Sequence, residues 1–301
     1  QKGTHLLPFF RAGMRIGPAY IVLGNIYGGA THRLPDPLYA QELNLTADPE
    51  MGAQVLIDKR WWHFDVWINW QSFIFKGDYH CEAFCTGISS RFRLSSRSSS
   101  FAKKGYELTL PVSALSQHVG GELDTIGKIS THFNASVGIE LKRRNPVRWL
   151  KEWSAETHLV GYNQSKGDTW PVGNGWGVYA AGQAQFTNGL GLKAGYMHNH
   201  DFQPLLGYNY YGTIAAGNDM ATPAATASDA TSATVSAASQ PGLYRHPDML
   251  TLRADWTKTF SHDYAFGVRV ETFAYFAGKS SFNTSFGMFF RATPSFRLLK
   301  R

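Results

Sequence analysis

Two small groups of polar residues in this sequence have types and spacings that could do chemistry. The segment His118-Val-Gly-Gly-Glu-Leu-Asp124 combines a histidine and carboxylates with two glycines, which adopt backbone conformations closed to other residues. We interpret His118, Gly120, Gly121 and Asp124 as a candidate ligand or ion site in a loop. The alternative is a tight loop with a purely structural role.

His63 and Asp65 form the second group, because residues two apart lie on the same face of a strand. A histidine and a carboxylate could begin a metal site, but the sequence offers no third ligand. We therefore expect no metal, no cofactor and no catalytic residue at this position.

Extended strands are the elements that must position these groups. In the segment 60–75, RWWHFDVWINWQSFIF, the apolar residues fall almost entirely on one parity and the polar residues on the other. A period of two is the signature of a strand. The same alternation recurs in 130–141, 149–162 and 282–298, and no segment has the periodicity of an amphipathic helix.

The predicted architecture is a single all-β domain over residues 1–301 with about 12 antiparallel strands, although 10 or 14 also fit. The expected strands are 13–25, 50–58, 61–74, 79–94, 101–112, 128–142, 148–162, 176–186, 190–199, 249–260, 263–277 and 282–298. Their connections are short at one end and mostly long at the other, the longest being a low-complexity external loop at about 200–247. This segregation is typical of closed transmembrane barrels of the bacterial outer membrane, with short periplasmic turns and long extracellular loops.

The two faces of the predicted sheet differ in a way that indicates which one is outside. The polar face carries many charged side chains. Enclosing them in the dry core of a soluble protein would cost several kcal/mol per unpaired charge. We therefore expect the polar face to line a lumen. The residues expected there are His63, Asp65, Asn69, His132, Glu140, Glu152, Glu156, His158, Arg253, Asp255, Arg269, Glu271 and Arg291. Aromatic residues near strand ends are expected to anchor the barrel at the membrane interfaces, namely Trp61, Trp62, Trp149, Trp153 and Trp176.

Composition excludes two other classes of protein. No run of about 18 apolar residues occurs, so a transmembrane helix is not expected. The formal net charge is +7, but the basic residues are dispersed and form no continuous face, so nucleic acid is not an expected partner.

The segments INWQSFIFKGDYHCEAFCTGIS (68–89) and PVSALSQHVGGELDT (111–125) resemble a poorly characterised family of outer-membrane barrels from the Bacteroidota. The resemblance implies an outer-membrane location and a barrel architecture. It implies no particular activity.

The first functional hypothesis is a non-catalytic outer-membrane barrel, either a porin-like channel or an accessory subunit of a larger outer-membrane complex. The alternative is a lipid-modifying enzyme of the phospholipase or lipid A deacylase type, because outer-membrane enzymes share this architecture. The segment His132-Phe-Asn134-Ala-Ser136 departs from the His-x-Ser order of the phospholipases, and parity turns it toward the lumen. Outer-membrane lipid and lipopolysaccharide are the expected partners, together with other outer-membrane proteins if the chain is a subunit.

Overall fold

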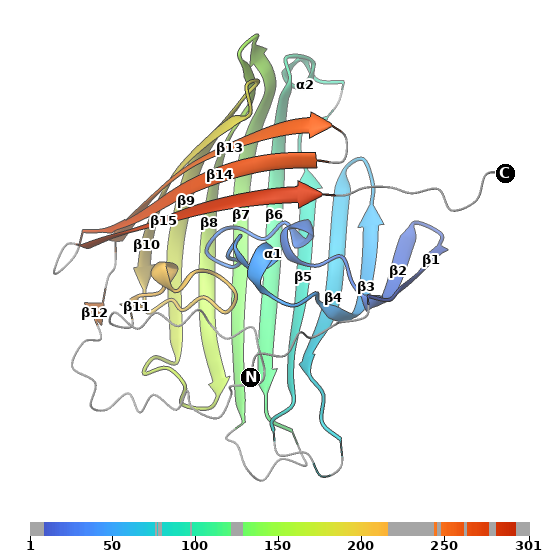
Figure 1. The fold of residues 1–301 in the computed structure, drawn as a ribbon, viewed down its shortest axis with the longest axis vertical. Helices are drawn as coiled ribbons and strands as arrows, with labels where there is room; N and C mark the ends of the chain where they lie inside the picture. Colours follow the sequence, from blue (N-terminus) through green and yellow to red (C-terminus); the bar gives the residue numbers. More distant parts are fainter. Residues whose placement is uncertain are drawn as a thin grey trace.

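The computed structural model describes residues 9–75, 77, 80–96, 98–121, 129–215, 244–245, 248–261, 264–276 and 281–292. Thirteen strands form one sheet in which every neighbouring pair is antiparallel, in the order β1-β2-β3-β4-β5-β6-β7-β8-β9-β10-β13-β14-β15 (Figure 1). The all-β antiparallel fold expected from the alternation is confirmed.

The strands are long, and several exceed ten residues. Their bounds are β1 Arg11–Ile16, β2 Ala19–Asn25, β3 Met51–Asp58, β4 Trp62–Ser72, β5 Ala83–Arg93, β6 Tyr106–Val119, β7 Ser130–Val147, β8 Leu150–Lys166, β9 Asn174–Phe186, β10 Leu190–His200, β13 Asp248–Ser261, β14 Tyr264–Tyr275 and β15 Ser281–Ala292. The short elements are η1 Gly29–His32, α1 Leu43–Thr46, α2 Ser100–Lys103, η2 Asn209–Tyr211 and the two-stranded pair β11 Ile214–Ala215 and β12 Tyr244–Arg245. No helix in the described part of the chain is long and apolar enough to cross a bilayer.

The expected count of 12 strands is wrong for this sheet, because the first expected strand is a hairpin. The chain reverses between Ile16 and Ala19, which are partners in the register of β1 and β2. Gly17 has φ +55°, as a two-residue hairpin turn requires at its first central position, and Pro18 supplies a fixed negative φ at the second. The proline inside the expected strand therefore marks a turn.

Strand β6 also differs from expectation, since it continues to Val119 rather than ending at residue 112. Pro111 lies within it and has no N–H to donate. The pairing of β6 with β7 skips Leu110 and Pro111 and resumes at Val112 in the same register. The interruption is tolerated because β5 pairs with β6 from Thr109 to Val119, Pro111 included.

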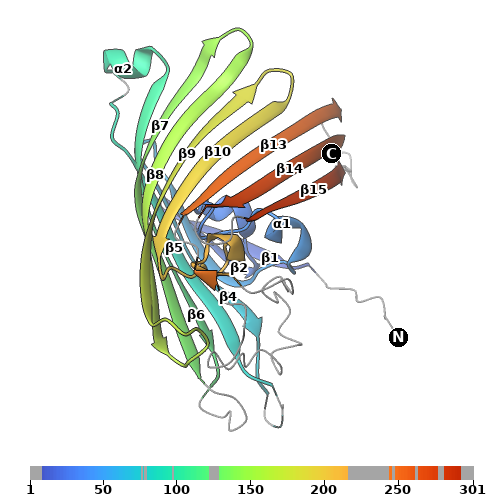
Figure 2. The same ribbon diagram turned by 90° about the vertical axis from the view of Figure 1, so that its left-hand side faces the viewer.

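Two connections fold against the concave side of the sheet, and we call residues 26–50 and 201–213 the inner plug (Figure 2). They bind one another through the amide of Ala40, which donates to the carbonyl of Leu206 at 2.7 Å. They bind the wall through Asn134, whose side chain donates to the carbonyl of Gln203 at 2.9 Å and accepts from the amide of Leu205 at 2.8 Å. Residues 26–49, which the sequence indicated as a long external link, therefore occupy the interior.

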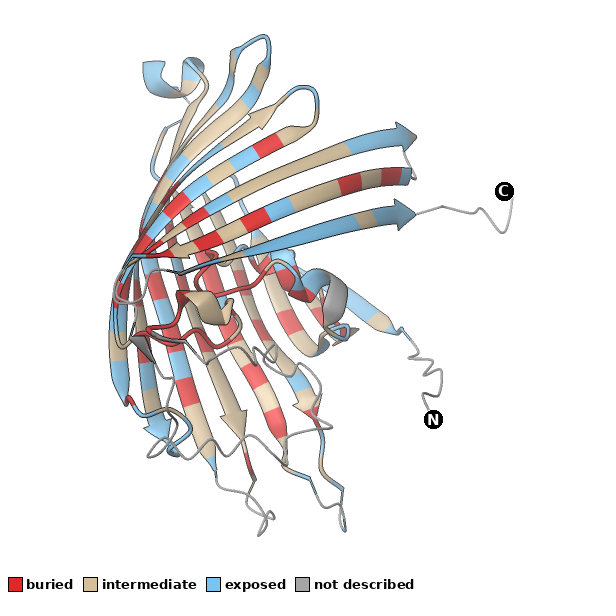
Figure 3. Ribbon diagram, turned by 60° about the vertical axis from the view of Figure 1, so that its left-hand side comes forward, coloured by how far each residue is buried: buried red, intermediate tan, exposed pale blue. Residues whose placement is uncertain are grey.

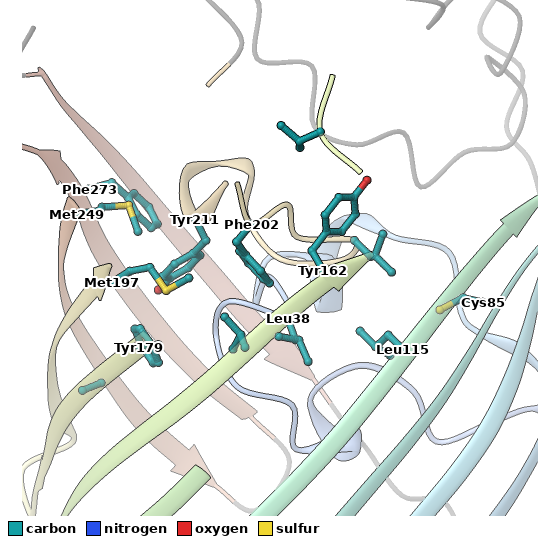
Figure 4. Close-up of a cluster of buried hydrophobic side chains, with 14 of the residues drawn as sticks. Leu38, Cys85, Leu115, Tyr162, Tyr179, Met197, Phe202, Tyr211, Met249 and Phe273 are labelled. Atoms are coloured by element: carbon teal, nitrogen blue, oxygen red, sulfur yellow. The ribbon is translucent and has the colours of Figure 1, made fainter. Parts of the chain in front are cut away.

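The core lies between the inner plug and the concave face of the sheet. Buried positions alternate along the strands and continue across the plug (Figure 3). The largest cluster joins Leu38 and Phe202 of the plug to Tyr179, Met197 and Phe273 of the wall (Figure 4). The convex face instead exposes large apolar side chains, for example Ile139, Leu159 and Leu252. This distribution, with apolar residues outside and polar residues inside, is the reverse of the distribution in the sheet of a soluble protein.

Strands β1 and β15 are the two edges of the sheet, and no pairing joins them among the described residues. An odd number of antiparallel strands makes the first and the last run in the same direction. The sheet curves strongly around the plug (Figure 2).

Candidate functional site

A serine, a histidine and a glutamate meet on the concave face where β7 and β8 pair. Ser136 Oγ lies 3.1 Å from Nδ1 of His158, and both residues are buried. The other ring nitrogen, Nε2, lies 3.5 Å from Oε2 of Glu156. These are the residue types, in the order of contact, that activate a serine hydroxyl as a nucleophile.

Strand geometry explains why these three side chains meet. Glu156 and His158 are two residues apart on β8 and so lie on the same face. The register pairs Ser136 with Val160 and Gly138 with His158, which makes Ser136 a diagonal neighbour of His158 on the adjacent strand. Diagonal neighbours on one face are within reach of a long side chain such as histidine.

Gly138 provides the space that the histidine ring occupies. A Cβ atom built on Gly138 would lie 2.5 Å from Nδ1 of His158 and 2.5 Å from the carbonyl oxygen of Thr157. Both distances are too short for any side chain without displacement of the ring and of the backbone at Thr157. The absence of a side chain at residue 138 therefore permits the contact between His158 and Ser136.

The neighbours of His158 favour one of the two neutral tautomers of its imidazole. A carboxylate is only an acceptor, so Glu156 favours the proton on Nε2 of His158. The lone pair then lies on Nδ1, where it can accept the hydroxyl proton of Ser136. The 3.5 Å contact to Glu156 is longer than an ordinary hydrogen bond, and contacts of this kind tighten when a substrate binds.

Lys193 connects this group to the inner plug. Its Nζ lies 2.8 Å from Glu156 and 2.9 Å from Asp36. Burial opposes the charge on Asp36, but the positive charges of Lys193 and Arg253 outweigh it and hold the pKa of Asp36 below its ordinary value. Tyr179 also donates a hydrogen bond to Asp36 at 3.2 Å. One ionised carboxylate of the plug is thus bound by three groups of the wall.

A second group of buried polar side chains, centred on His32, also binds the plug to the sheet. His32 lies between two carboxylates, with Nδ1 at 2.7 Å from Asp65 and Nε2 at 3.1 Å from Glu50. Burial would lower the pKa of His32, but the hydrogen bonds to Asp65 and Glu50 outweigh burial and the pKa is raised. The ring stacks on Trp67 with centroids 3.6 Å apart. Gly87 leaves room for that indole, since a Cβ there would lie 2.2 Å from it.

The residues predicted to line a lumen fall at different depths. Five are buried, namely Asp65, His132, Glu140, His158 and Glu271. Seven are intermediate in exposure, namely His63, Asn69, Glu152, Glu156, Arg253, Asp255 and Arg269. Arg291 is exposed near the end of the edge strand β15. His132 binds Tyr162 at 3.0 Å, and Arg253 lies 3.8 Å from Glu271, its partner in the register.

The structure describes His118, Gly120 and Gly121 of the predicted loop site. His118 belongs to β6, where its ring contacts Phe84 and its Nδ1 lies 2.9 Å from Oγ1 of Thr131. Gly120 has φ +103° and Gly121 follows it, so the glycines do form the turn out of the strand. Asp124 lies outside the described residues. Among the predicted anchors, Trp61, Trp149 and Trp176 are exposed, whereas Trp62 and Trp153 are partly buried.

Sequence reasoning considered Ser136 only within a motif of the wrong order and did not connect it with His158. It missed His32 and Asp36 entirely. No local spacing could have identified these pairs, because Ser136 and His158 are 22 positions apart and Asp36 contacts strands far along the chain. The available signal was register, since alternation and turn position together place Ser136 beside His158. No group of three or more His, Cys, Asp or Glu side chains in the described part of the chain could hold a metal ion.

Fold and site together define an all-β protein with a buried Ser-His-Glu group. The family model described as lipid A 3'-O-deacylase-type matches residues 1–301, and the chain belongs to this family. The predicted resemblance to an outer-membrane family of the Bacteroidota type is thereby confirmed. The match favours the lipid-modifying alternative over the non-catalytic channel that was the first hypothesis. No curated protein matches the chain.

Proposed function

We propose that this protein is an outer-membrane hydrolase that removes an ester-linked acyl chain from lipid A or a closely related lipid. Ser136 is the nucleophile, His158 the general base and Glu156 the group that orients the imidazole. The observation that carries the proposal is the contact of Ser136 with one nitrogen of His158 while Glu156 faces the other. The family match supplies the class of substrate.

The proposed reaction is an acyl transfer in two halves. His158 Nδ1 takes the hydroxyl proton as Ser136 Oγ attacks the ester carbonyl, and the tetrahedral intermediate then expels the sugar hydroxyl, which leaves with that proton. Water attacks the acyl-serine in the second half and gives a proton to His158, which returns it to Ser136 Oγ as the fatty acid is released. Proton transfer of this kind contributes roughly 10²- to 10⁴-fold to the rate.

Glu156 and His158 reach solvent-accessible space through a cavity of about 660 Å³. Its wall includes plug residues such as Asp36 and residues of the turn between β3 and β4. His158 and Glu156 therefore border a cavity that the plug bounds on one side, whereas Ser136 does not line it. A site enclosed in this way limits access of water and strengthens electrostatic interactions within it.

We propose further that the sheet closes into a barrel in the outer membrane. The apolar convex face suits lipid, and backbone groups at an open edge cannot be satisfied in a bilayer. Closure of all thirteen strands would pair β1 and β15 in parallel. Cysteine pairs introduced along β1 and β15 should form disulfides in the folded protein. No cross-link at any register would oppose closure at these edges.

The decisive test of the hydrolase is incubation of the purified protein with lipopolysaccharide, followed by mass spectrometry of the lipid and of released fatty acid. Wild-type protein should release an acyl chain, and Ser136→Ala should release none above background. Ser89→Ala is the matched control, because Ser89 is also buried in the sheet and its Oγ has no hydrogen-bond partner. Equal activity of wild type and Ser136→Ala would exclude Ser136 as the nucleophile.

The non-catalytic interpretations have less support. The inner plug fills the concave side of the sheet, which disfavours an open diffusion channel. The accessory-subunit interpretation stays a prediction.

A further inference from the structure

The cavity beside the proposed catalytic group is unusually rich in positive charge. Its basic wall residues are Arg33, Lys59, Arg60, Arg91, Arg93, Lys142, Arg144, Lys193 and Arg253. Its acidic wall residues are Asp36, Asp58, Glu107, Glu140 and Glu156. Nine basic and five acidic groups leave an excess of four positive charges in one enclosure of about 660 Å³.

Most of these carboxylates are already bound to a cation. Glu140 pairs with Arg91 and lies 3.5 Å from Lys142, and Glu107 pairs with Arg93. Glu156 and Asp36 are shared by Lys193. Arg33 has no carboxylate within ion-pairing distance in the described part of the chain, and its side chain is exposed to the cavity. Arg33 is therefore one of the cations that contribute to the excess positive charge of the cavity.

Arg33 has a left-handed backbone conformation that few residues with a Cβ atom adopt. Its φ is 55° and its ψ is 37°, at the residue that ends η1. The preceding residue, His32, is fixed by Asp65 and Glu50, so the surrounding structure imposes this conformation. Strained backbone conformations of this kind cluster at active sites and ligand clamps. Here it gives the cavity wall an unpaired guanidinium.

Arg91 and His63 line the same cavity as Arg33. Its positive charge repels that of Arg91 and acts on His63 as well. His63 is the direct partner of Arg91 in the pairing of β4 with β5. Both ring nitrogens of His63 are buried without a hydrogen bond, and the nearest carboxylate, Asp58, lies 3.6 Å away. The cavity wall thus places the guanidinium of Arg33 and the imidazole of His63 together with Arg91, whose carboxylate partner is Glu140.

We propose that Arg33, Arg91 and His63 form a binding site for a phosphate group. Guanidinium groups bind phosphate through paired, charge-assisted hydrogen bonds, and a phosphate offers oxygens to several donors at once. Trp61 and Trp62 also line the cavity and could contact an organic group attached to the phosphate. The ligand is either free phosphate or the phosphorylated headgroup of a lipid. The site goes beyond ester hydrolysis and does not depend on it.

The test is calorimetric titration of the full wild-type chain in detergent at low salt. The two probes are inorganic phosphate and glucosamine 1-phosphate, a phosphorylated sugar without acyl chains. Arg33→Gln should weaken binding of the preferred probe at least about tenfold, and Arg33→Lys should weaken it less, because it keeps the charge but loses the fork. Arg148→Gln is the matched control, since Arg148 is exposed and lies outside the cavity.

Equal affinity for both probes would show that the site recognises the phosphate alone. Clearly tighter binding of glucosamine 1-phosphate would identify a headgroup site. Binding of neither probe would overturn the proposal. So would affinities that are the same in the wild-type background, Arg33→Gln and Arg33→Lys, with folding of the variants checked by gel mobility. Loss of hydrolysis in Ser136→Ala leaves the titration unaffected, so this proposal and the proposed function can fail separately.

Discussion

Ser136 Oγ and His158 Nδ1 are 3.1 Å apart, although the two residues belong to different strands and are 22 positions apart in the chain. The contact depends on the register of β7 and β8, which sets Gly138 directly opposite His158. The histidine therefore leans over a residue without a side chain and reaches the serine beyond it. The proposed chemistry of the site depends on this diagonal contact between the two neighbouring strands.

Gly138→Ala should abolish most of the activity, and because its Cβ would also lie 2.5 Å from the backbone oxygen of Thr157, folding of the variant is checked by gel mobility. A Cβ at residue 138 would lie 2.5 Å from His158 Nδ1, so the ring must move away from Ser136. We expect acyl release to fall by about 10²-fold or more, as a misplaced base implies. Gly161→Ala is the control on the neighbouring strand, because a Cβ there meets nothing within 4 Å. Full activity of Gly138→Ala in the mass-spectrometric assay would contradict the geometry.

Glu156→Gln should lower kcat while leaving the fold intact. The side-chain amide of the new glutamine no longer favours the proton on Nε2 of His158. The imidazole therefore spends part of its time as the tautomer with the proton on Nδ1, which cannot accept the proton of Ser136. We expect a loss of about 10²- to 10⁴-fold in the rate of acyl release. Glu152→Gln serves as the control, since Glu152 lies on the same strand and instead pairs with Lys142 and Arg144. A rate within about twofold of wild type would rule out the orienting role.

Alternation of residue types was sufficient to predict the strands of the wall. It placed Asp65 and Trp67 on one face, and both are buried. It failed at Pro18, where a turn interrupts an alternating segment, and at residue 112, where the expected strand ended but β6 continues to Val119. In both cases the outcome depends on neighbouring strands, which a local pattern does not contain.

The inner plug could not be predicted for a related reason. Residues 26–50 are a connection of ordinary polarity, and their place in the fold is set by single contacts with distant residues. Asp36 requires Lys193, and His32 requires Asp65. The sequence did hint that the interior is filled, because Trp67 falls on the polar face. The structure explains this indole by its stacking on His32.

His32 should make the stability of the plug depend on pH. The pKa of His32 is raised in the folded protein. The charged imidazole is therefore stabilised more by Asp65 and Glu50 in the folded protein than by water in the unfolded chain. The stabilisation is fully present below the unfolded pKa of about 6.5 and is lost as pH rises through the folded pKa. His32→Gln should therefore lower the free energy of unfolding more at pH 6 than at pH 9. The expected difference is about 2 kcal/mol, the scale of a hydrogen bond to a charged group.

The measurement is the difference in thermal stability between wild type and His32→Gln across this range, followed by gel mobility. Loss of the stacking on Trp67 affects the variant at every pH, so only the pH-dependent part reports the charge. His200→Gln is the control, because that side chain is 69% exposed. A difference that is constant with pH, or larger at pH 9, would contradict the assignment.

Removal of the plug should convert the protein into a channel. Residues 28–48 lie between the ends of β2 and β3 and pack against the concave face, so replacing them with a short Gly-Ser linker leaves the strands in place. The deletion removes His32 and Asp36 and so leaves Asp65, Lys193 and Arg253 facing water. In planar bilayers the wild type should show no stable conductance steps, and the deletion variant should show regular ones that are sensitive to salt. Regular steps from the wild type would restore the channel hypothesis, whereas a silent deletion variant that is correctly folded would indicate that residues 201–213 suffice to block the lumen.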